Sequence, residues 1–154
     1  MIKVLITGAG SYVGTSVEKW LTKDGEMLVD SVDTMNDKWK EADFTKYDVV
    51  YHVAGIAHVN ADPKMEALYY KVNRDLAIEV AKWAKEHGVK QFIYMSSGIV
   101  YKASKSLKGD VKTKDTVPCP NDFYGDSKLQ AENGLKELDC PSFQVCILRP
   151  PMIY

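Results

Sequence analysis

A tyrosine and a lysine stand four residues apart in the segment Tyr124-Gly-Asp-Ser-Lys128. The segment begins a predicted helix over residues 124–138, so the two side chains share one helical face. A lysine cation beside a tyrosine stabilises the phenolate and lowers the tyrosine pKa from its usual value of about 10 towards neutral pH. The same ammonium group can also hold a ribose hydroxyl. Tyr124 and Lys128 are therefore a candidate proton-transfer pair, but this spacing is common by chance and needs support from the rest of the chain.

Support comes from the start of the chain, where a strand, a glycine-rich turn and a helix follow one another. Residues 1–7 are an apolar run rich in branched side chains, typical of a strand buried on both faces. The turn Gly8-Ala-Gly-Ser-Tyr-Val-Gly14 comes next, and Val17, Trp20 and Leu21 share one side of the helix that follows. In such a unit the glycines let the backbone approach a pyrophosphate, and the helix N-terminus presents N–H groups to it. A purely structural turn is the alternative. The predicted dinucleotide contacts in this turn are Gly8, Gly10, Ser11, Tyr12, Val13 and Gly14.

An acidic residue stands where a dinucleotide-binding fold holds the adenosine ribose. Residues 27–33 are predicted to form a second strand, and Asp33 ends it about 20 residues beyond Gly14. Because no arginine follows to receive a 2′-phosphate, the sequence favours NAD over NADP. The alternatives are that Asp33 only ends the strand, or that Asp30 or Asp37 takes this role in a different register.

The stretch 34–47 is too short for the connection that usually follows the second strand. A complete half of this fold would place a helix, a third strand and another helix there, but the next strand is predicted at 48–54. We therefore expect no helix of two or more turns in this stretch. Trp39 and Phe44 are expected to cover the surface of the sheet.

Small residues follow the predicted strand 48–54 at its carboxyl end, the edge where ligands bind in open parallel sheets. They are expected to let the cofactor pass close to the backbone. The residues predicted to do so are Val53, Ala54 and Gly55. A helix over residues 64–87 and a strand over residues 90–97 are predicted next, from the apolar spacing of each.

Composition limits the possible partners. The chain has 154 residues, the size of one domain, and a net charge of −1, which implies no nucleic-acid partner. No apolar run approaches the roughly 20 residues of a membrane span, and there is no signal peptide. An odd number of cysteines without paired spacing suggests free thiols in a reducing cytoplasm. The histidines match no metal-binding spacing, so we expect structural roles and no metal for His52, His58 and His87.

Four segments carry a wider pattern: Thr7–Gly14, Asp48–Gly55, Ser96–Tyr101 and Tyr124–Lys128. Together they resemble the NAD-dependent epimerase/dehydratase family, the sugar-nucleotide branch of the extended short-chain dehydrogenases. The resemblance implies an α/β fold of the Rossmann type, a doubly wound parallel sheet in three α/β/α layers, over residues 1–154. With a shortened connection and a missing or rudimentary third strand, we expect the strand order 2-1-4-5-6.

The resemblance also implies roles for single residues. Ser97 matches the catalytic serine or threonine, Tyr124 the proton-transferring tyrosine and Lys128 its helper, and all three would also contact the cofactor. The acidic-apolar pair Asp43-Phe44 resembles the family's adenine contact, and Asn73 resembles an asparagine near the cofactor. A buried hydrogen bond to a neighbouring strand is an equal alternative for Asn73. Pro150 and Ile153 resemble the proline turn that walls the nicotinamide.

The implied reaction is reversible hydride transfer between NAD and a nucleotide sugar, with Tyr124 taking a hydroxyl proton and Ser97 bonding the reacting oxygen. Dehydratases of the family usually carry Asp-Glu directly after the serine or threonine, and here Gly98-Ile99 follow. A 4-epimerase of the UDP-glucose/galactose type is therefore favoured. The alternatives are an NAD-dependent reductase and a non-catalytic NAD-binding module.

Family members normally continue with a lobe that holds the nucleotide sugar, and this lobe is absent from the 154-residue chain. They also pair as homodimers. We expect a homodimer through the helices at 64–87 and 124–138, because their apolar stripes are wider than one sheet face needs.

Overall fold

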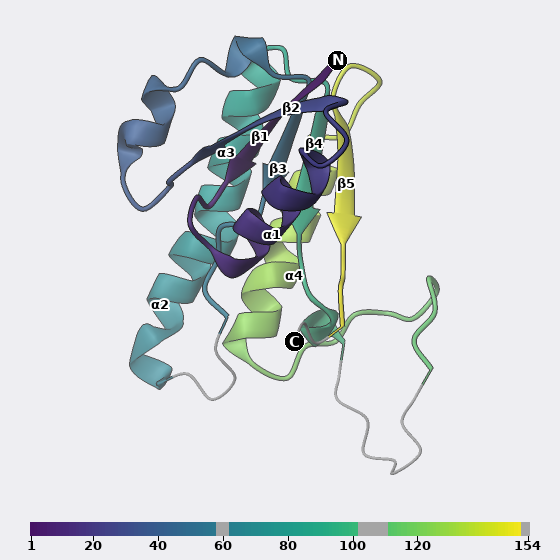
Figure 1. Cartoon of the computed structure of the whole chain (residues 1–154). Helices are drawn as coiled ribbons and strands as arrows, with labels where there is room; N and C mark the ends of the chain where they lie inside the picture. The colour runs from purple at the N-terminus through teal and green to yellow at the C-terminus, as the bar shows by residue number, and fades with distance from the viewer. Residues whose placement is uncertain (58–61, 102–110, 152–154) are drawn as a thin grey trace.

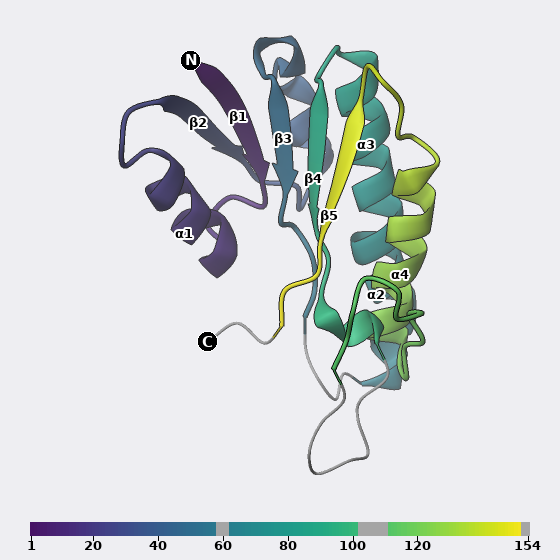
Figure 2. The ribbon, with the colours of Figure 1, turned by 90° about the vertical axis from the view of Figure 1, so that its right-hand side faces the viewer.

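The computed structural model describes residues 1–57, 62–101 and 111–151, and a parallel sheet of five strands lies at its centre. The strands lie in the spatial order β2-β1-β3-β4-β5 (Figure 2). Their bounds are Ile2–Thr7 for β1, Met27–Val32 for β2, Val49–His52 for β3, Gln91–Met95 for β4 and Gln144–Leu148 for β5. The predicted order is confirmed, because β3, β4 and β5 correspond to the fourth, fifth and sixth strands of the complete fold.

Helices cover both faces of the sheet, so the predicted three layers are confirmed as well. One face carries α1, and the other carries α2, α3 and α4 (Figure 1; Figure 2). The helices are α1 (Tyr12–Leu21), α2 (Glu66–Tyr69), α3 (Leu76–Glu86) and α4 (Phe123–Lys136). The larger core lies between the sheet and α3 and α4, and it includes Leu5, Val50, Phe92, Ala77, Ala81 and Leu135.

Local sequence explains where these elements begin and end. The strands contain branched and aromatic residues, which favour extended backbone, as in the Ile-Lys-Val-Leu-Ile-Thr of β1. Helix α4 begins where the carboxylate of Asp122 accepts the backbone N–H of Gly125 at 2.7 Å. Helix α3 ends just before Gly88, whose φ of +79° suits the residue after a helix.

Helix α1 buries less of its surface than the sequence predicted. Val17 and Leu21 pack against the sheet, but Trp20 is 72% exposed, with the ammonium group of Lys23 over its ring. The expectation that Trp20 shares the inward side is therefore wrong. The reason is that a ten-residue helix beside β1 and β2 buries only a narrow stripe.

The stretch between β2 and β3 contains only two short 3₁₀ turns, η1 (Asp37–Glu41) and η2 (Phe44–Lys46). This confirms the prediction that the connection is short and contains no helix of two or more turns. Trp39 and Phe44 are 1% and 0% exposed, and they belong to the same core cluster as the residues under α3. The short connection thus covers the sheet with two aromatic side chains instead of a helix.

The helix predicted over residues 64–87 is interrupted in its middle. A 3₁₀ turn (η3, Pro63–Met65) leads into α2, and a π-helical turn (η4, Tyr70–Asp75) separates α2 from α3. Such turns occur frequently at functional sites. Within this one, Asn73 is fully buried and its carbonyl accepts the hydroxyl of Tyr94 at 3.0 Å. The π turn therefore fixes Asn73 against β4.

Several expectations concern membrane spans, metal sites, cysteines and histidines. Among the described residues, no helix is long and apolar enough to cross a membrane, and no group of His, Cys, Asp or Glu side chains has the arrangement of a metal site. The three cysteines are free thiols, as expected. His87 ends α3, with Nδ1 2.7 Å from the carbonyl oxygen of Trp83, whereas His58 lies outside the described residues.

Candidate active site

The glycine-rich turn after β1 is fixed by hydrogen bonds to β2. The N–H groups of Gly8 and Ala9 both donate to the carbonyl of Val32, at 2.9 and 3.1 Å. Gly8 has a φ of +109°, which favours glycine, and a Cβ there would lie 2.9 Å from the backbone nitrogen of Ala54. The turn therefore brings the ends of β1, β2 and β3 together at one edge of the sheet.

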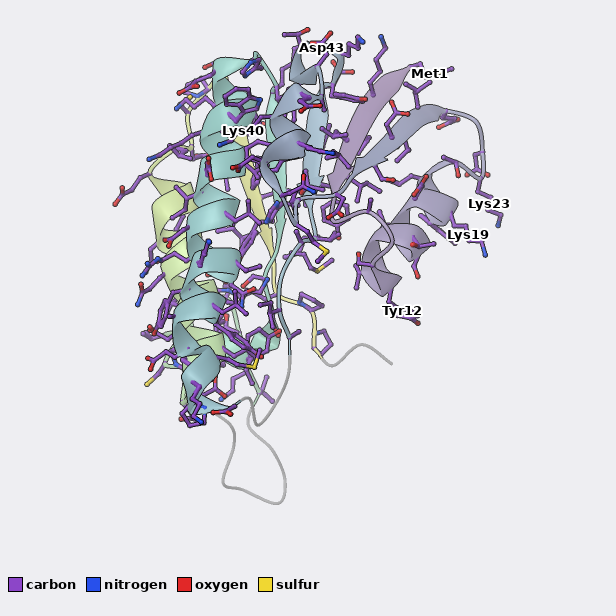
Figure 3. All side chains as sticks on the ribbon, turned by 90° about the vertical axis from the view of Figure 1, so that its left-hand side faces the viewer. Met1, Tyr12, Lys19, Lys23, Lys40 and Asp43 are labelled. Atoms are coloured by element: carbon purple, nitrogen blue, oxygen red, sulfur yellow. The ribbon has the colours of Figure 1, made fainter. Side chains whose placement is uncertain are left out.

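The start of α1 has the geometry of an anion-binding site. Ser11 caps α1, because its Oγ accepts the N–H of Gly14 at 3.0 Å. A Cβ on Gly14 would lie 2.8 Å from that Oγ, whereas a Cβ on Gly10 would meet nothing within 4 Å. Tyr12 lies exposed at the first turn of α1 (Figure 3), and Val13 is half-buried. The turn is closed on the Gly14 side and open above Gly10, so its backbone fits a pyrophosphate at the helix N-terminus.

Asp33 lies directly after β2, beside the glycine-rich turn. Its carboxylate is exposed and accepts a backbone N–H two residues further on at 2.9 Å. The two alternatives lie elsewhere. Asp30 is within β2 and accepts the hydroxyl of Tyr47 at 2.8 Å, and Asp37 begins η1. Of the three carboxylates, Asp33 is the one that follows the strand end to which the turn is bonded.

The end of β3 is tied to the end of β1. The N–H groups of Val53 and Ala54 both donate to the carbonyl of Thr7 at 3.0 Å. The Thr7 hydroxyl lies 2.7 Å from Nδ1 of His52, whose pKa is lowered to about 3, mainly by burial. His52 is therefore neutral and structural, as expected, although its Nε2 has no hydrogen-bond partner among the described residues.

Asn73 holds the loop that follows β3. Its Oδ1 accepts the N–H of Ile56 at 2.8 Å, and its Nδ2 donates to the carbonyl of Ile56 at 3.1 Å and to Oγ of Ser127 at 3.2 Å. A Cβ on Gly55 would lie 3.0 Å from Asn73 Oδ1 and 3.1 Å from Lys128 Nζ. Asn73 thus has the buried hydrogen-bonding role that the sequence left open, and its side chain has no exposed surface to offer a cofactor.

Ser97 and Tyr124 meet at the carboxyl edge of β4. Ser97 follows β4 and caps a short 3₁₀ turn, η5 (Gly98–Val100), where its Oγ accepts the N–H of Ile99 at 3.2 Å. Its side chain also interacts with the nearby Tyr124 hydroxyl and lowers the pKa of that hydroxyl. Burial raises the pKa of Tyr124, and the interaction with Ser97 only partly opposes this. The direction is opposite to the one predicted from the sequence.

Lys128 explains why the Tyr124 pKa is not lowered. Its Nζ donates to the carbonyl of Met95 at 2.9 Å and lies 4.9 Å from the ring centroid of Tyr94. The side chain is 4% exposed, and burial lowers the Lys128 pKa to about 8. The ammonium group is thus directed at the end of β4 and not at the Tyr124 hydroxyl. It lies next to Gly55, at the same edge as the glycine-rich turn.

Two glycines set the spacing of these segments. A Cβ on Gly125 would lie 2.7 Å from the carbonyl oxygen of Ile99, so the first turn of α4 packs directly on η5. The N–H of Gly98 donates to the carbonyl of Pro150 at 2.8 Å, which attaches η5 to the segment after β5. Pro150 therefore lies beside the Ser97 segment, and the nicotinamide contact that the resemblance implies for it stays a prediction. Ile153 lies outside the described residues.

The predicted adenine contact at Asp43 and Phe44 needs correction. Figure 3 shows Asp43 near Met1, at the opposite end of the sheet from Tyr12. The Asp43 carboxylate caps η2 by accepting the N–H and hydroxyl of Thr45, and the Phe44 ring is fully buried. The reason is the short connection between β2 and β3. Because it contains no additional strand, the pair directly precedes β3 and lies at the edge of the sheet where β3 starts.

Sequence reasoning missed one charged residue near the site. Glu132 lies on α4 and is fully buried, paired with Arg149. The available signal was spacing, because Tyr124, Lys128 and Glu132 follow one another at intervals of four along the same helix. A buried carboxylate at the third position cannot be told from an exposed one by spacing alone.

The family model that matches this chain is described as the NAD dependent epimerase/dehydratase family, and it matches residues 4–154. The chain belongs to this family. The resemblance carried by the four segments is thereby confirmed, and the chain is a member of a family of enzymes that depend on NAD.

Relatives within the family are epimerases of nucleotide sugars. The UDP-glucose 4-epimerase of Vibrio cholerae is 34% identical over 170 aligned residues, which cover 98% of this chain and 52% of that protein. The UDP-glucose 4-epimerase of Homo sapiens is 26% identical, over 88% of this chain and 48% of its own length. The chain thus spans about half the length of these curated relatives.

Solved structures of other proteins share the fold. A UDP-glucuronic acid 4-epimerase from Bacillus cereus in complex with NAD has a TM-score of 0.77 at 22% identity, over 99% of this chain and 58% of that one. A dTDP-4-dehydrorhamnose reductase from Bacillus anthracis in complex with NADP has a TM-score of 0.80 at 25% identity, over 100% of this chain and 55% of that one. This fold is therefore shared by an epimerase and a reductase.

Proposed function

We propose that the chain is the NAD-binding domain of a nucleotide-sugar epimerase, of the UDP-glucose/galactose 4-epimerase type. The observation that carries this proposal is the meeting of Ser97, Tyr124 and Lys128 at the sheet edge that also holds the glycine-rich turn. The relatives from Vibrio cholerae and Homo sapiens support the substrate class. Gly98-Ile99 after Ser97, in place of Asp-Glu, disfavour dehydration.

The chain's own residues can bind the cofactor and move one proton. The turn Gly8–Gly14 would hold the pyrophosphate of NAD, Asp33 the adenosine ribose and Lys128 the second ribose. Bound NAD would supply the hydride acceptor and donor. Tyr124, in its ionised form, would take the proton of the reacting sugar hydroxyl and return it later, and the neighbouring Ser97 would hydrogen-bond the same sugar oxygen.

A reductase is the second candidate, and the protonation of Tyr124 favours it. Because burial raises the Tyr124 pKa, its hydroxyl is protonated at neutral pH and can donate a proton to a carbonyl oxygen that receives hydride. The Bacillus anthracis neighbour is a reductase with the same fold. Reduced NAD and a 4-keto nucleotide sugar distinguish the two when they are added to the chain joined to a sugar-binding lobe. A reductase oxidises the cofactor in proportion to the sugar, whereas an epimerase oxidises at most the cofactor that is bound to it.

The proposed ribose contact gives the first prediction. Replacing Asp33 by Ala should weaken NAD binding by about tenfold or more, because a charge-assisted hydrogen bond contributes roughly 1.5–3 kcal/mol. Calorimetric titration of NAD into wild type and variant measures the change. Asp37→Ala removes an exposed carboxylate from the nearby η1 turn and serves as the control, with affinity expected to be unchanged. Equal NAD affinity in wild type and Asp33→Ala would assign the ribose to another residue.

We also propose that two copies associate through the segments 64–87 and 124–138. Helices α3 and α4 lie side by side on the outer face (Figure 1; Figure 2), and Leu68 is 44% exposed beside them. Much of their apolar stripe is used by the sheet, and a polar network crosses between η4 and α4, so the interface would be partly polar. That network consists of Tyr70, Arg74, Asp126 and Gln130.

Light scattering at about 50 µM should therefore give twice the chain mass of 17.3 kDa, falling towards the monomer on dilution by mass action. Leu68→Lys places a charge in the interface and should shift the equilibrium towards monomer. Asn133→Ala, at an exposed position of α4, is a control for a change that removes no apolar contact. A monomeric mass for the wild type at the highest concentration would exclude this interface in the chain.

A further inference from the structure

A carboxylate lies at the centre of a buried hydrogen-bond network behind the candidate active site. Glu132 is 0% exposed, and its Oε1 accepts the hydroxyl of Ser96 at 2.6 Å and the Nε–H of Arg149 at 2.9 Å. Its Oε2 accepts the same Nε–H at 3.2 Å and an N–H of Nη2 of the same guanidinium. Arg149 in turn donates to the hydroxyl of Tyr101. Both carboxylate oxygens are therefore hydrogen-bonded, as a buried charge requires.

The network joins segments that are far apart in the sequence. Ser96 directly follows β4, Tyr101 directly follows η5, and Arg149 directly follows β5. The N–H of Ser96 also donates to the carbonyl of Leu148 at 2.8 Å, so the ends of β4 and β5 are held together. Through its hydrogen bonds with Ser96 and Arg149, Glu132 links α4 to the ends of both strands.

One cation is paired with this carboxylate, and a second lies one helical turn away on the same helix. Arg149 is paired with Glu132 directly, and Lys128 lies one helical turn before it on α4. Glu132 raises the pKa of Arg149, and it opposes the burial that lowers the pKa of Lys128 to about 8. The other titratable groups around Lys128 are uncharged at neutral pH: His52 from β3, Tyr94 from β4 and Tyr124 from its own helix. Among the described residues, Glu132 is thus the carboxylate that offsets the Lys128 charge.

We propose that Glu132 is a positioning residue of the candidate active site, which fastens the Ser97 segment to α4 and balances the charge of Lys128. The inference rests on the proposed function for its relevance to catalysis, but the charge balance itself can be measured on the chain without cofactor. A purely structural ion pair would hold the fold together without controlling the protonation of Lys128. The positioning role and the purely structural role therefore predict different results in a titration of Lys128.

The test uses two variants that remove opposite charges. Glu132→Gln keeps the shape of the side chain but removes the negative charge near Lys128 and Arg149, so the pH at the midpoint of the Lys128 titration should decrease. Arg149→Met removes the positive charge that is paired with Glu132, so Glu132 acts on Lys128 alone and the midpoint pH should increase. NMR of carbon-labelled lysine side chains measures both, with the Lys128 signal assigned by its loss in Lys128→Arg. Glu79→Gln, which breaks the Lys40–Glu79 ion pair, is the control and should leave the midpoint unchanged.

Circular dichroism shows whether each variant folds. If an unpaired buried charge unfolds a single variant, the double variant Glu132→Gln/Arg149→Met replaces it, because it leaves neither partner charged. Its Lys128 midpoint should lie below that of the wild type, since the offsetting carboxylate is gone. Shifts of the two single variants in the same direction, or a double variant that titrates like the wild type, would overturn the proposal.

NAD titration separates this inference from the proposed function. Glu132→Gln should bind NAD more weakly than the wild type at about pH 8 and regain affinity towards about pH 6.5, because the lower pH restores the Lys128 cation. A loss of affinity that is equal at both pH values would contradict the charge-balancing role. A wild-type chain that does not bind NAD would refute the proposed function, and the Lys128 titration would still decide the role of Glu132.

Discussion

Replacing Tyr124 by Phe should reduce epimerisation by about 10²–10⁴-fold while leaving NAD affinity within about twofold, because positioned general acid–base groups contribute factors of that size. The substitution removes one hydroxyl and keeps the ring. That ring packs edge-on against Tyr69 with centroids 5.9 Å apart, so the fold of the site should survive. The substitution removes the hydroxyl beside Ser97 that is proposed to carry the proton.

The measurement needs a protein that can hold the sugar. A chimera in which the second half of the Vibrio cholerae UDP-glucose 4-epimerase follows this chain supplies a sugar-binding lobe from a 34% identical relative. Epimerisation of UDP-glucose is then compared between the chimera with Tyr124 and the one with Phe. Tyr47→Phe removes a hydroxyl that hydrogen-bonds Asp30, outside the site, and should leave the rate unchanged. Full activity in the Tyr124→Phe chimera would exclude Tyr124 as the proton carrier.

The sequence predicted those features that local spacing determines. The turn at Gly8–Gly14 and the strand before it are recognisable because glycine and branched residues restrict the backbone over a few positions. Tyr124 and Lys128 were proposed from their four-residue spacing and Ser97 from the resemblance to the family, and the structure brings the end of β4 and the first turns of α4 together at one edge of the sheet.

The features that the sequence did not predict depend on contacts across the fold. Phe44 and Asp43 matched a family pattern, but the missing third strand moves them to the other edge of the sheet. The raised pKa of Tyr124 follows from burial and from the direction of the Lys128 ammonium group, which four-residue spacing does not determine. Asn73 is buried by a π-helical turn whose residues fit an ordinary helix equally well.

The 154-residue chain alone should bind NAD yet interconvert UDP-glucose and UDP-galactose at least about 100-fold more slowly than the chimera, since misplacing a substrate by about 1 Å can cost that much in rate. The groups for proton transfer are present in the chain at Ser97, Tyr124 and Lys128. The relatives, however, are about twice as long, and we attribute the placing of the sugar to the part that this chain does not cover.

Parallel assays of the chain and of the chimera at equal NAD saturation measure this difference in the rate of epimerisation. The Vibrio cholerae enzyme serves as the positive control. NAD binding by the chain shows that a slow rate does not come from an unfolded cofactor site. If the chain alone turned over at a rate comparable to the chimera, residues 1–154 would themselves position the sugar, and the proposed division between a cofactor domain and a sugar-binding lobe would be wrong.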